Sequence, residues 1–118
     1  MEQKHEGMIV GFDCHTDVRV AAALNPMGQL QATRTFPASP EAYAMTAKWL
    51  DGLSPVLAVG VESTGSYGAA LTRALTRSGI RVIEVNRPHR HLRARRGKSD
   101  AIDAEAAARK VLSGETTG

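Results

Sequence analysis

Apolar and polar positions alternate with a strand-like period over the first third of the chain and a helical period later. Residues 8–13 form a short apolar run that ends in an acid, as a buried central strand does. Residues 18–24 and 29–36 alternate as strands, with the turn signal Asn-Pro-Met-Gly at 25–28 between them. The pattern therefore predicts a meander of three strands.

The later part of the chain alternates helices with strands. Ser39-Pro40 provides a cap and a proline at a helix start, and glycines stand where each helix is expected to end. We predict helices over 39–52, 63–79 and 99–114 and strands over 56–62 and 80–85. Crossover helices imply parallel pairing of the later strands. The predicted fold is an α/β domain, a mixed five-stranded sheet with helices on its faces.

Composition limits the class of protein further. With 118 residues, 42% of them hydrophobic, the chain can bury one real core. Cys14 is the single cysteine, so no internal disulfide forms and a reducing compartment is expected. The charged N-terminus does not resemble a secretory signal, and no apolar run is long enough to span a membrane. We expect a cytoplasmic, nucleoid-associated protein.

The net charge of +3 conceals a local basic segment at residues 87–98. This segment holds six of the fifteen Lys and Arg residues and none of the twelve acids. Such a concentration favours a polyanion, and above all a nucleic-acid backbone, whose phosphates it would position without reading sequence. The predicted nucleic-acid-binding residues here are Arg87, Arg90, Arg93, Arg95, Arg96 and Lys98.

Two aspartates open the last predicted helix. Asp100 and Asp103 fall in the same angular sector as Ala104 and Ala107, so they lean towards the body of the domain. This sector joins the predicted apolar face of the helix, which consists of Ala101, Ala104, Ala108, Val111 and Leu112. Acids at a helix N-terminus also complement the helix dipole, and that alone would explain an isolated Asp-x-x-Asp. The other acids of the chain decide between these interpretations.

Asp13 and Glu62 each stand at the carboxyl end of a predicted strand. Ligands of open α/β sheets gather at these ends. If the two strands are parallel neighbours, their acids meet at one edge, where the final helix can bring Asp100 and Asp103. Four carboxylates need a counter-charge, and Mg²⁺ (or Mn²⁺) prefers their oxygens and serves phosphoryl transfer. The sequence thus predicts a metal site.

Four stretches of the chain carry a family resemblance. They are Val-Gly-Phe-Asp at 10–13 with His15, Gly-Val-Glu-Ser-Thr-Gly-Ser-Tyr at 60–67, Val-Asn-Arg-Pro at 85–88, and Arg-Gly-Lys-Ser-Asp-Ala-Ile-Asp-Ala at 96–104. In this order they resemble the N-terminal RuvC-like DEDD domain of the insertion-sequence-110 family of transposases, which includes the Piv invertase. The resemblance extends over the whole chain.

That resemblance implies a ribonuclease-H-like fold and metal-dependent cleavage and transfer of DNA strands. By motif match, the catalytic and metal-binding residues are Asp13, Glu62, Asp100 and Asp103. It further implies DNA as the partner, a structured guide RNA in some members, and a homo-oligomer in the full-length proteins. The composition itself indicates nothing about RNA.

The chain departs from the family pattern in two ways. Residue 16 is Thr where the family often has Lys. The sequence also stops at Gly118, whereas family members continue into a domain that supplies a serine nucleophile. We therefore expect one RuvC-like catalytic domain over residues 1–118, incomplete for recombination without the serine-containing domain.

Several residues near the acids are secondary candidates. His15, two positions after Asp13, faces the same side if the strand continues and could contact phosphate or water. Ser66 and Tyr67 could bind a phosphate at a helix N-terminus, although capping and packing explain them equally well. Cys14 faces away from Asp13 and is expected to be a small buried residue.

Three other functions remain open at this point. A junction-resolving nuclease would use the same acids without a second domain. A non-catalytic fragment would bind nucleic acid through the arginine segment alone. A sugar-kinase or actin-like half domain would explain Gly11-Phe12-Asp13 and the turn at 25–28 as a phosphate hairpin, but it leaves Asp100 and Asp103 unexplained.

Overall fold

A computed structural model describes residues 7–53, 55–63, 68–85 and 99–114, without the side chains of Ser63, Ser99 and Asp100. No helix in these described ranges is long and apolar enough to cross a membrane.

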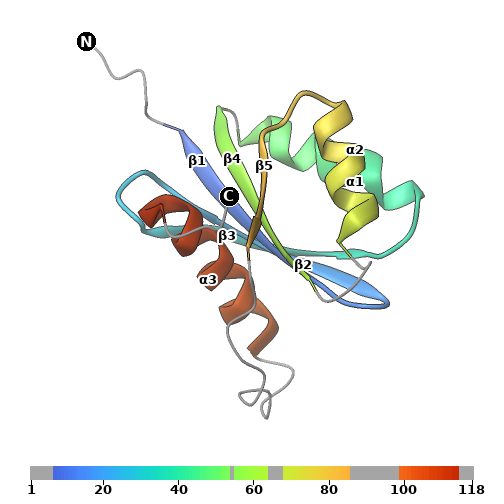
Figure 1. Cartoon of the computed structure of the whole chain (residues 1–118), viewed down its shortest axis with the longest axis horizontal. Helices are drawn as coiled ribbons and strands as arrows, with labels where there is room; N and C mark the ends of the chain where they lie inside the picture. The colour runs from blue at the N-terminus through green and yellow to red at the C-terminus, as the bar shows by residue number, and fades with distance from the viewer. Residues whose placement is uncertain (1–6, 54, 64–67, 86–98, 115–118) are drawn as a thin grey trace.

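The elements follow the predicted order of three strands, a helix, a strand, a helix, a strand and a final helix (Figure 1). Their bounds are β1 Met8–Cys14, β2 Val18–Leu24, β3 Leu30–Pro37, α1 Glu41–Gly52, β4 Val56–Ser63, α2 Ala69–Arg77, β5 Val82–Val85 and α3 Ser99–Ser113. The starts of α1 and α2 come later than predicted. Pro40, at the N-cap position of α1, already has helical angles and makes no side-chain cap.

The five strands form one mixed sheet in the order β3-β2-β1-β4-β5. β1, β2 and β3 pair antiparallel, as a meander does, whereas β4 pairs parallel with both β1 and β5. The two crossovers that the parallel pairs require run through α1 and α2. The predicted α/β fold with a mixed five-stranded sheet is confirmed.

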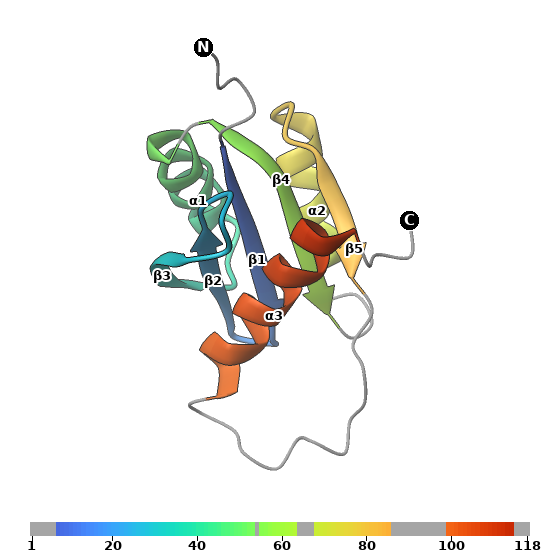
Figure 2. The ribbon, with the colours of Figure 1, turned by 90° about the vertical axis from the view of Figure 1, so that its left-hand side faces the viewer.

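Helices cover the two faces of the sheet unequally (Figure 2). α1 and α2 pack on one face, where the even-numbered side chains of β1 meet Leu71 and Leu75 in the largest core cluster. α3 alone covers the other face, where Ile9 and Ala58 pack with Ala108. Since successive strand residues point to opposite faces, the odd-numbered positions of β1, Asp13 among them, face α3.

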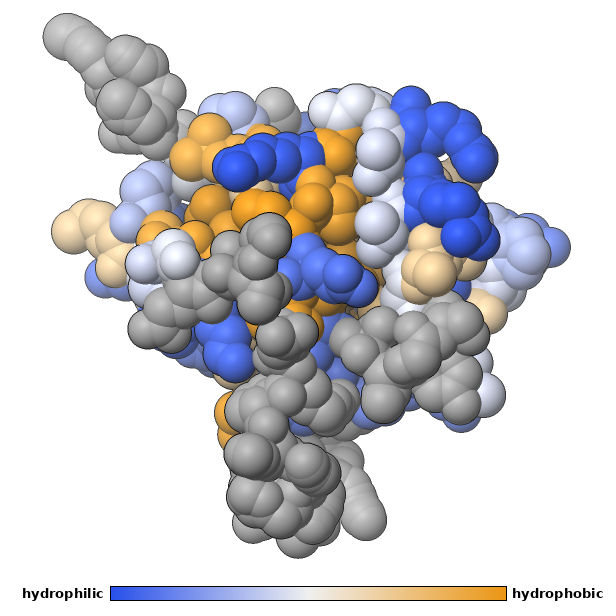
Figure 3. All heavy atoms as spheres, in the orientation of Figure 1, coloured by the Kyte–Doolittle hydropathy of each residue, from blue (hydrophilic) through white to orange (hydrophobic). Residues whose placement is uncertain are grey.

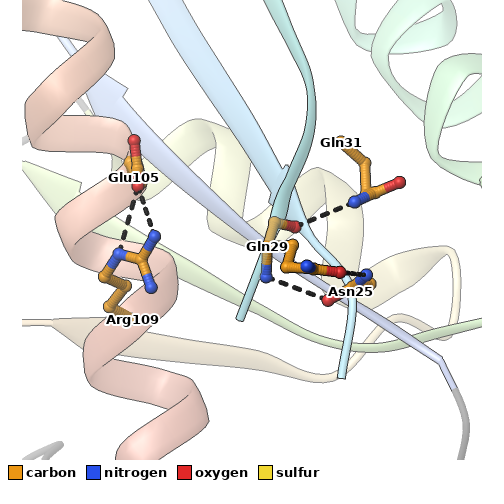
Figure 4. A network of polar contacts seen from close by, with 5 residues as sticks. All are labelled: Asn25, Gln29, Gln31, Glu105 and Arg109. Carbon is orange, nitrogen blue, oxygen red and sulfur yellow. Dashed lines mark hydrogen bonds and ion pairs between the residues drawn. The ribbon is translucent and has the colours of Figure 1, made fainter. Parts of the chain in front are cut away.

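The turn between β2 and β3 is closed by side chains (Figure 4). Asn25 Oδ1 accepts hydrogen bonds from the backbone N–H groups of Met27 at 3.0 Å and Gln29 at 2.9 Å, an arrangement typical of Asx turns. Gly28 has a φ of 84°, which a residue with a side chain rarely adopts. Arg109, whose Nε donates to Glu105 at 3.1 Å, lies beside this turn at the far end of α3.

Two glycines let α3 approach the sheet closely. A Cβ atom on Gly11 of β1 would collide with the backbone of Ala104 and Ala108, and one on Gly60 of β4 would lie 2.6 Å from Val111. Gly11 therefore touches the first half of α3, while the turn at Gly28, beside the start of β1, touches its last part. α3 runs against β1, and its N-terminus lies near the carboxyl ends of β1 and β4.

The buried side of α3 differs slightly from the predicted one. Ala104, Ala107 and Ala108 are fully buried, but Ala101 and Leu112, which the sequence pattern placed on the apolar face, are exposed. The contact face is therefore turned towards the sector that contains Asp103, which is half-buried. The helix approaches the glycines of the sheet so closely that only small residues such as alanine fit at the contact.

We predict that Gly11→Ala destabilises the domain by about 1–3 kcal/mol, the usual cost of overpacking, because the atoms it meets belong to the backbone of α3. Urea unfolding measures the effect. Gly52→Ala is the matched control, since no atom lies within 4 Å of the added methyl group. Equal stability of the Gly11 variant and the wild type would contradict the close approach of α3.

Candidate functional site

Asp13 and Glu62 lie side by side at the carboxyl ends of β1 and β4. They are direct partners in the register of these two parallel strands, so their side chains leave the same face of the sheet. Neighbouring strands are about 4.8 Å apart, which places two carboxyl groups within one small site. This is the adjacency that the strand-end positions of the two acids predicted.

Both carboxyl groups are withdrawn from solvent. Asp13 is 0% exposed and Glu62 is 4% exposed, so little water reaches either side chain. Two like charges in a buried place repel each other and lose hydration, which is costly unless opposite charge or hydrogen bonds compensate. A buried pair of this kind needs compensating partners, and such pairs are common in active sites.

His15 contacts the buried pair from the solvent side. Its Nε2 lies 2.8 Å from Oδ2 of Asp13, and its side chain is 35% exposed, against 0% for the aspartate. β1 ends at Cys14, and the backbone N–H of His15 donates to the carbonyl of Val18, which holds the histidine in the turn to β2. The expectation that His15 faces the same side as Asp13 is confirmed.

The two helix acids approach from α3. Asp103 is half-buried and lies one turn before Ala107, whose carbonyl faces Gly60. Asp100 belongs to the first turn of α3, and its side chain lies outside the described residues. Among the described side chains, no three His, Cys, Asp or Glu residues lie close enough together to hold a metal ion. The sheet brings together half of the predicted tetrad.

The predicted nucleic-acid-binding residues all lie outside the described residues. They are Ser66, Tyr67, Arg87, Arg90, Arg93, Arg95, Arg96 and Lys98. Their roles stay predictions.

Cys14 occupies the opposite face of β1, as expected. It is 1% exposed and packs in the core cluster under α1 and α2. Burial raises the pKa of its thiol to about 12; nearby Arg19 opposes the rise, and Asp13 and Glu62 add to it. The thiol is thus neutral at physiological pH.

Arg19 is a buried charge that the sequence reasoning missed. It is 4% exposed and donates to the carbonyl of Pro37 at 3.1 Å and to the hydroxyl of Tyr43 at 2.9 Å, with its guanidinium 4.7 Å from the Tyr43 ring centroid. Within the described part of the chain, its Nε has no hydrogen-bond partner. In the sequence Arg19 stands between two valines of a predicted strand, and α1 covers the face on which it lies. Arg19 joins β2 to α1.

The topology and the acidic edge together define a class. A meander followed by two parallel crossover strands, in the order β3-β2-β1-β4-β5, with α3 on the other face, is a ribonuclease-H-like fold. A family model described as transposase, that of the insertion-sequence-110 DEDD transposases, matches residues 10–117. The chain belongs to this family.

A search of solved structures finds a similar fold in a glucokinase. A ROK family glucokinase from Streptomyces griseus, crystallised with glucose and AMPPNP, superposes with a TM-score of 0.50 at 17% identity. The match covers 68% of this chain and 33% of the glucokinase, so the chain spans about a third of that protein's length. At this identity the likeness shows the α/β fold alone. No curated protein matches the chain.

We predict that the Cys14 thiol does not react with a disulfide reagent such as DTNB at pH 8 while the chain is folded. Burial both blocks access and keeps the thiol protonated. The same chain in denaturant should react fully, which serves as the control. Rapid reaction of the native chain would show that Cys14 is open to solvent.

Proposed function

We propose that this chain is the catalytic domain of a DNA transposase or recombinase, with Asp13, Glu62, Asp100 and Asp103 as ligands of Mg²⁺ or Mn²⁺. The observation that carries the proposal is the register pairing of Asp13 with Glu62, both buried and on one face. Family membership supplies DNA as the class of substrate. Metal dependence and strand transfer go beyond what family membership supplies and belong to the proposal.

The residues present fit a hard divalent cation. Asp13 and Glu62 offer carboxylate oxygens, the ligands that Mg²⁺ and Mn²⁺ prefer, and their burial gives a cation a strong electrostatic advantage. When bound, the metal supplies positive charge that activates water and stabilises the leaving oxygen of a phosphodiester. The β1–β4 pairing fixes two ligands, whereas Asp100 and Asp103 come from a separate helix.

His15 and α3 orient this site. The hydrogen bond between His15 Nε2 and Oδ2 of Asp13 fixes the orientation of the Asp13 carboxyl group. The glycine contacts of α3 set how far Asp103 stands from the strand ends. The orientation of the site therefore depends on residues outside the proposed tetrad.

A stand-alone junction-resolving nuclease is the alternative that uses the same acids, and a non-catalytic nucleic-acid-binding fragment is the alternative that does not. Several further statements stay predictions that rest on sequence and family resemblance. They are the single RuvC-like domain over residues 1–118, the need for a serine-containing domain, the guide RNA, the homo-oligomer and the cytoplasmic, nucleoid-associated location.

We predict that Asp13→Asn and Glu62→Gln each abolish high-affinity Mn²⁺ binding, measured by calorimetry in the absence of DNA. Each removes a ligand from the buried pair without adding bulk. Asp17→Asn, at an exposed acid just beyond His15, is the matched control and should bind Mn²⁺ as the wild type does. Unchanged Mn²⁺ affinity in both site variants would refute the metal centre.

Cleavage of branched DNA in Mg²⁺ separates the remaining alternatives. Cleavage by this chain, lost in Asp13→Asn and Asp103→Asn, supports a nuclease that needs no further domain. Metal binding without cleavage supports a transposase domain that needs its serine-containing partner. If no metal binds and DNA affinity depends only on the arginine segment, the chain is a binding fragment.

We predict that His15→Ala weakens Mn²⁺ affinity by about 10–100-fold, the usual cost of losing a hydrogen bond to a metal-binding carboxylate. His15→Gln, which can still donate to Asp13, should recover most of the affinity. Unfolding in urea controls for folding. Equal affinities of the Ala variant and the wild type would assign His15 to the turn alone.

A further inference from the structure

Basic residues extend well beyond the arginine segment at 87–98. Residues 63–98 contain nine of the fifteen Lys and Arg residues of the chain and only one of its twelve acids, Glu84. Three of the nine, Arg73, Arg77 and Arg81, lie in the described part of the fold, on α2 and immediately before β5. The rest of the chain is acidic on balance. The positive charge therefore follows one crossover of the sheet.

The three arginines lie on the outer surface. Leu71 and Leu75 form the buried side of α2, and Arg73 and Arg77, four residues apart, fall on the opposite side of the helix. All three arginines are exposed, and among the described residues none forms an ion pair with a carboxylate. Figure 3 shows hydrophilic side chains gathered over α2, beside the apolar centre of this face.

A groove runs between α2 and β5 at this edge of the sheet. Its volume is about 410 Å³, and Gly68, Thr72 and Arg73 line one side while Val82 and Glu84 line the other. It opens next to the start of α2, close to where β4 ends. Glu84 is the single carboxylate of this surface, and its neighbour Val85 is the register partner of Glu62. Because neighbouring strand residues point to opposite faces, the groove lies on the face of the sheet opposite the candidate metal site, near the same strand ends.

We propose that the arginine ridge, formed by Arg73 and Arg77 on the exposed side of α2, binds the phosphate backbone of duplex DNA beside the α2–β5 groove. The ridge lies on the helix layer opposite α3, so it would hold the part of the duplex that extends away from the acidic edge. The proposal rests on the proposed function for DNA as the substrate. It adds a surface and a path for that DNA.

Duplex DNA fits the ridge better than a single strand does. Arg and Thr side chains along a helix contact phosphates, and the rise of about 6 Å between Arg73 and Arg77 corresponds to about two nucleotide steps of about 3.4 Å each along a strand. Sequence-tolerant binding of single strands uses aromatic side chains for base stacking. α2, from Ala69 to Arg77, contains no aromatic residue. The chemistry of the ridge is that of backbone contact alone.

The test is the salt dependence of binding to a duplex of arbitrary sequence, measured in EDTA by fluorescence anisotropy with the whole chain. Each phosphate contact contributes about 0.9 to the slope of log K against log salt, so Arg73→Gln with Arg77→Gln should lower the slope by about two. Arg34→Gln with Lys48→Gln removes two exposed charges from β3 and α1 and is the matched control. Gln favours helix, so α2 should fold normally.

Equal slopes for the ridge variant and the control variant would overturn the proposal. A greater loss for a hairpin RNA than for the duplex would overturn it as well, because the ridge would then serve RNA. The measurement needs no metal and should give the same slope in Asp13→Asn. The salt slope therefore tests the ridge independently of the metal site. Failure of the proposed metal site and failure of the proposed ridge give different results.

Discussion

The architecture of this domain depends on how closely α3 can approach the sheet. Gly11 and Gly60 stand on the two adjacent central strands, β1 and β4, and the space that their missing side chains leave is filled by the backbone of α3 and by Val111. A larger residue at either position would push the helix outwards. Asp100 and Asp103 belong to that helix. The glycine contacts of α3 therefore set the distance between these two acids and the strand acids Asp13 and Glu62.

The two faces of the sheet differ in how they are packed. On the face under α1 and α2, large side chains such as Phe12 and Leu71 form a conventional core, and Cys14 is inert within it. The face under α3 combines glycines, alanines and buried carboxyl groups with a few larger apolar residues such as Ile9 and Leu24, so it contributes less packing energy. The core under α1 and α2 therefore supplies most of the packing energy, and the buried acids Asp13 and Glu62 lie on the other face. Such a division is common where functional residues reduce stability.

Most of the fold could be predicted from the sequence because its signals are local. The apolar runs of β1 and β4, the turn at 25–28 and the helical spacing of α1 and α2 each fix an element without reference to its neighbours. The pairing of Asp13 with Glu62 also followed, because parallel strands bring their carboxyl ends together. The starts of α1 and α2 were less accurate, since fraying and capping depend on a few weak bonds.

What the sequence left out depends on contacts between distant segments. Arg19 alternates with valines as an exposed residue would, and only the position of α1, with Tyr43, explains its burial. The hydrogen bond from His15 to Asp13 required the exact end of β1, which periodicity does not locate. The buried side of α3 is likewise decided by glycines on other strands rather than by its own apolar residues, as exposed Leu112 shows.

The topology links acidic and basic groups through one crossover. β4 delivers Glu62 to the edge of the sheet, α2 then carries its arginines back along the outer layer, and β5 returns the chain to the same edge, where Val85 pairs with Glu62. The basic stretch at 87–98 follows directly in the sequence, and α3 comes next with its two aspartates. β1, β4 and β5 therefore end at one edge of the sheet, while α2 leads away from that edge along the outer layer. Under the proposed function, the arginines of α2 hold phosphates at a distance from the acidic pair, so the groups that attract a cation and the groups that attract phosphate do not neutralise one another.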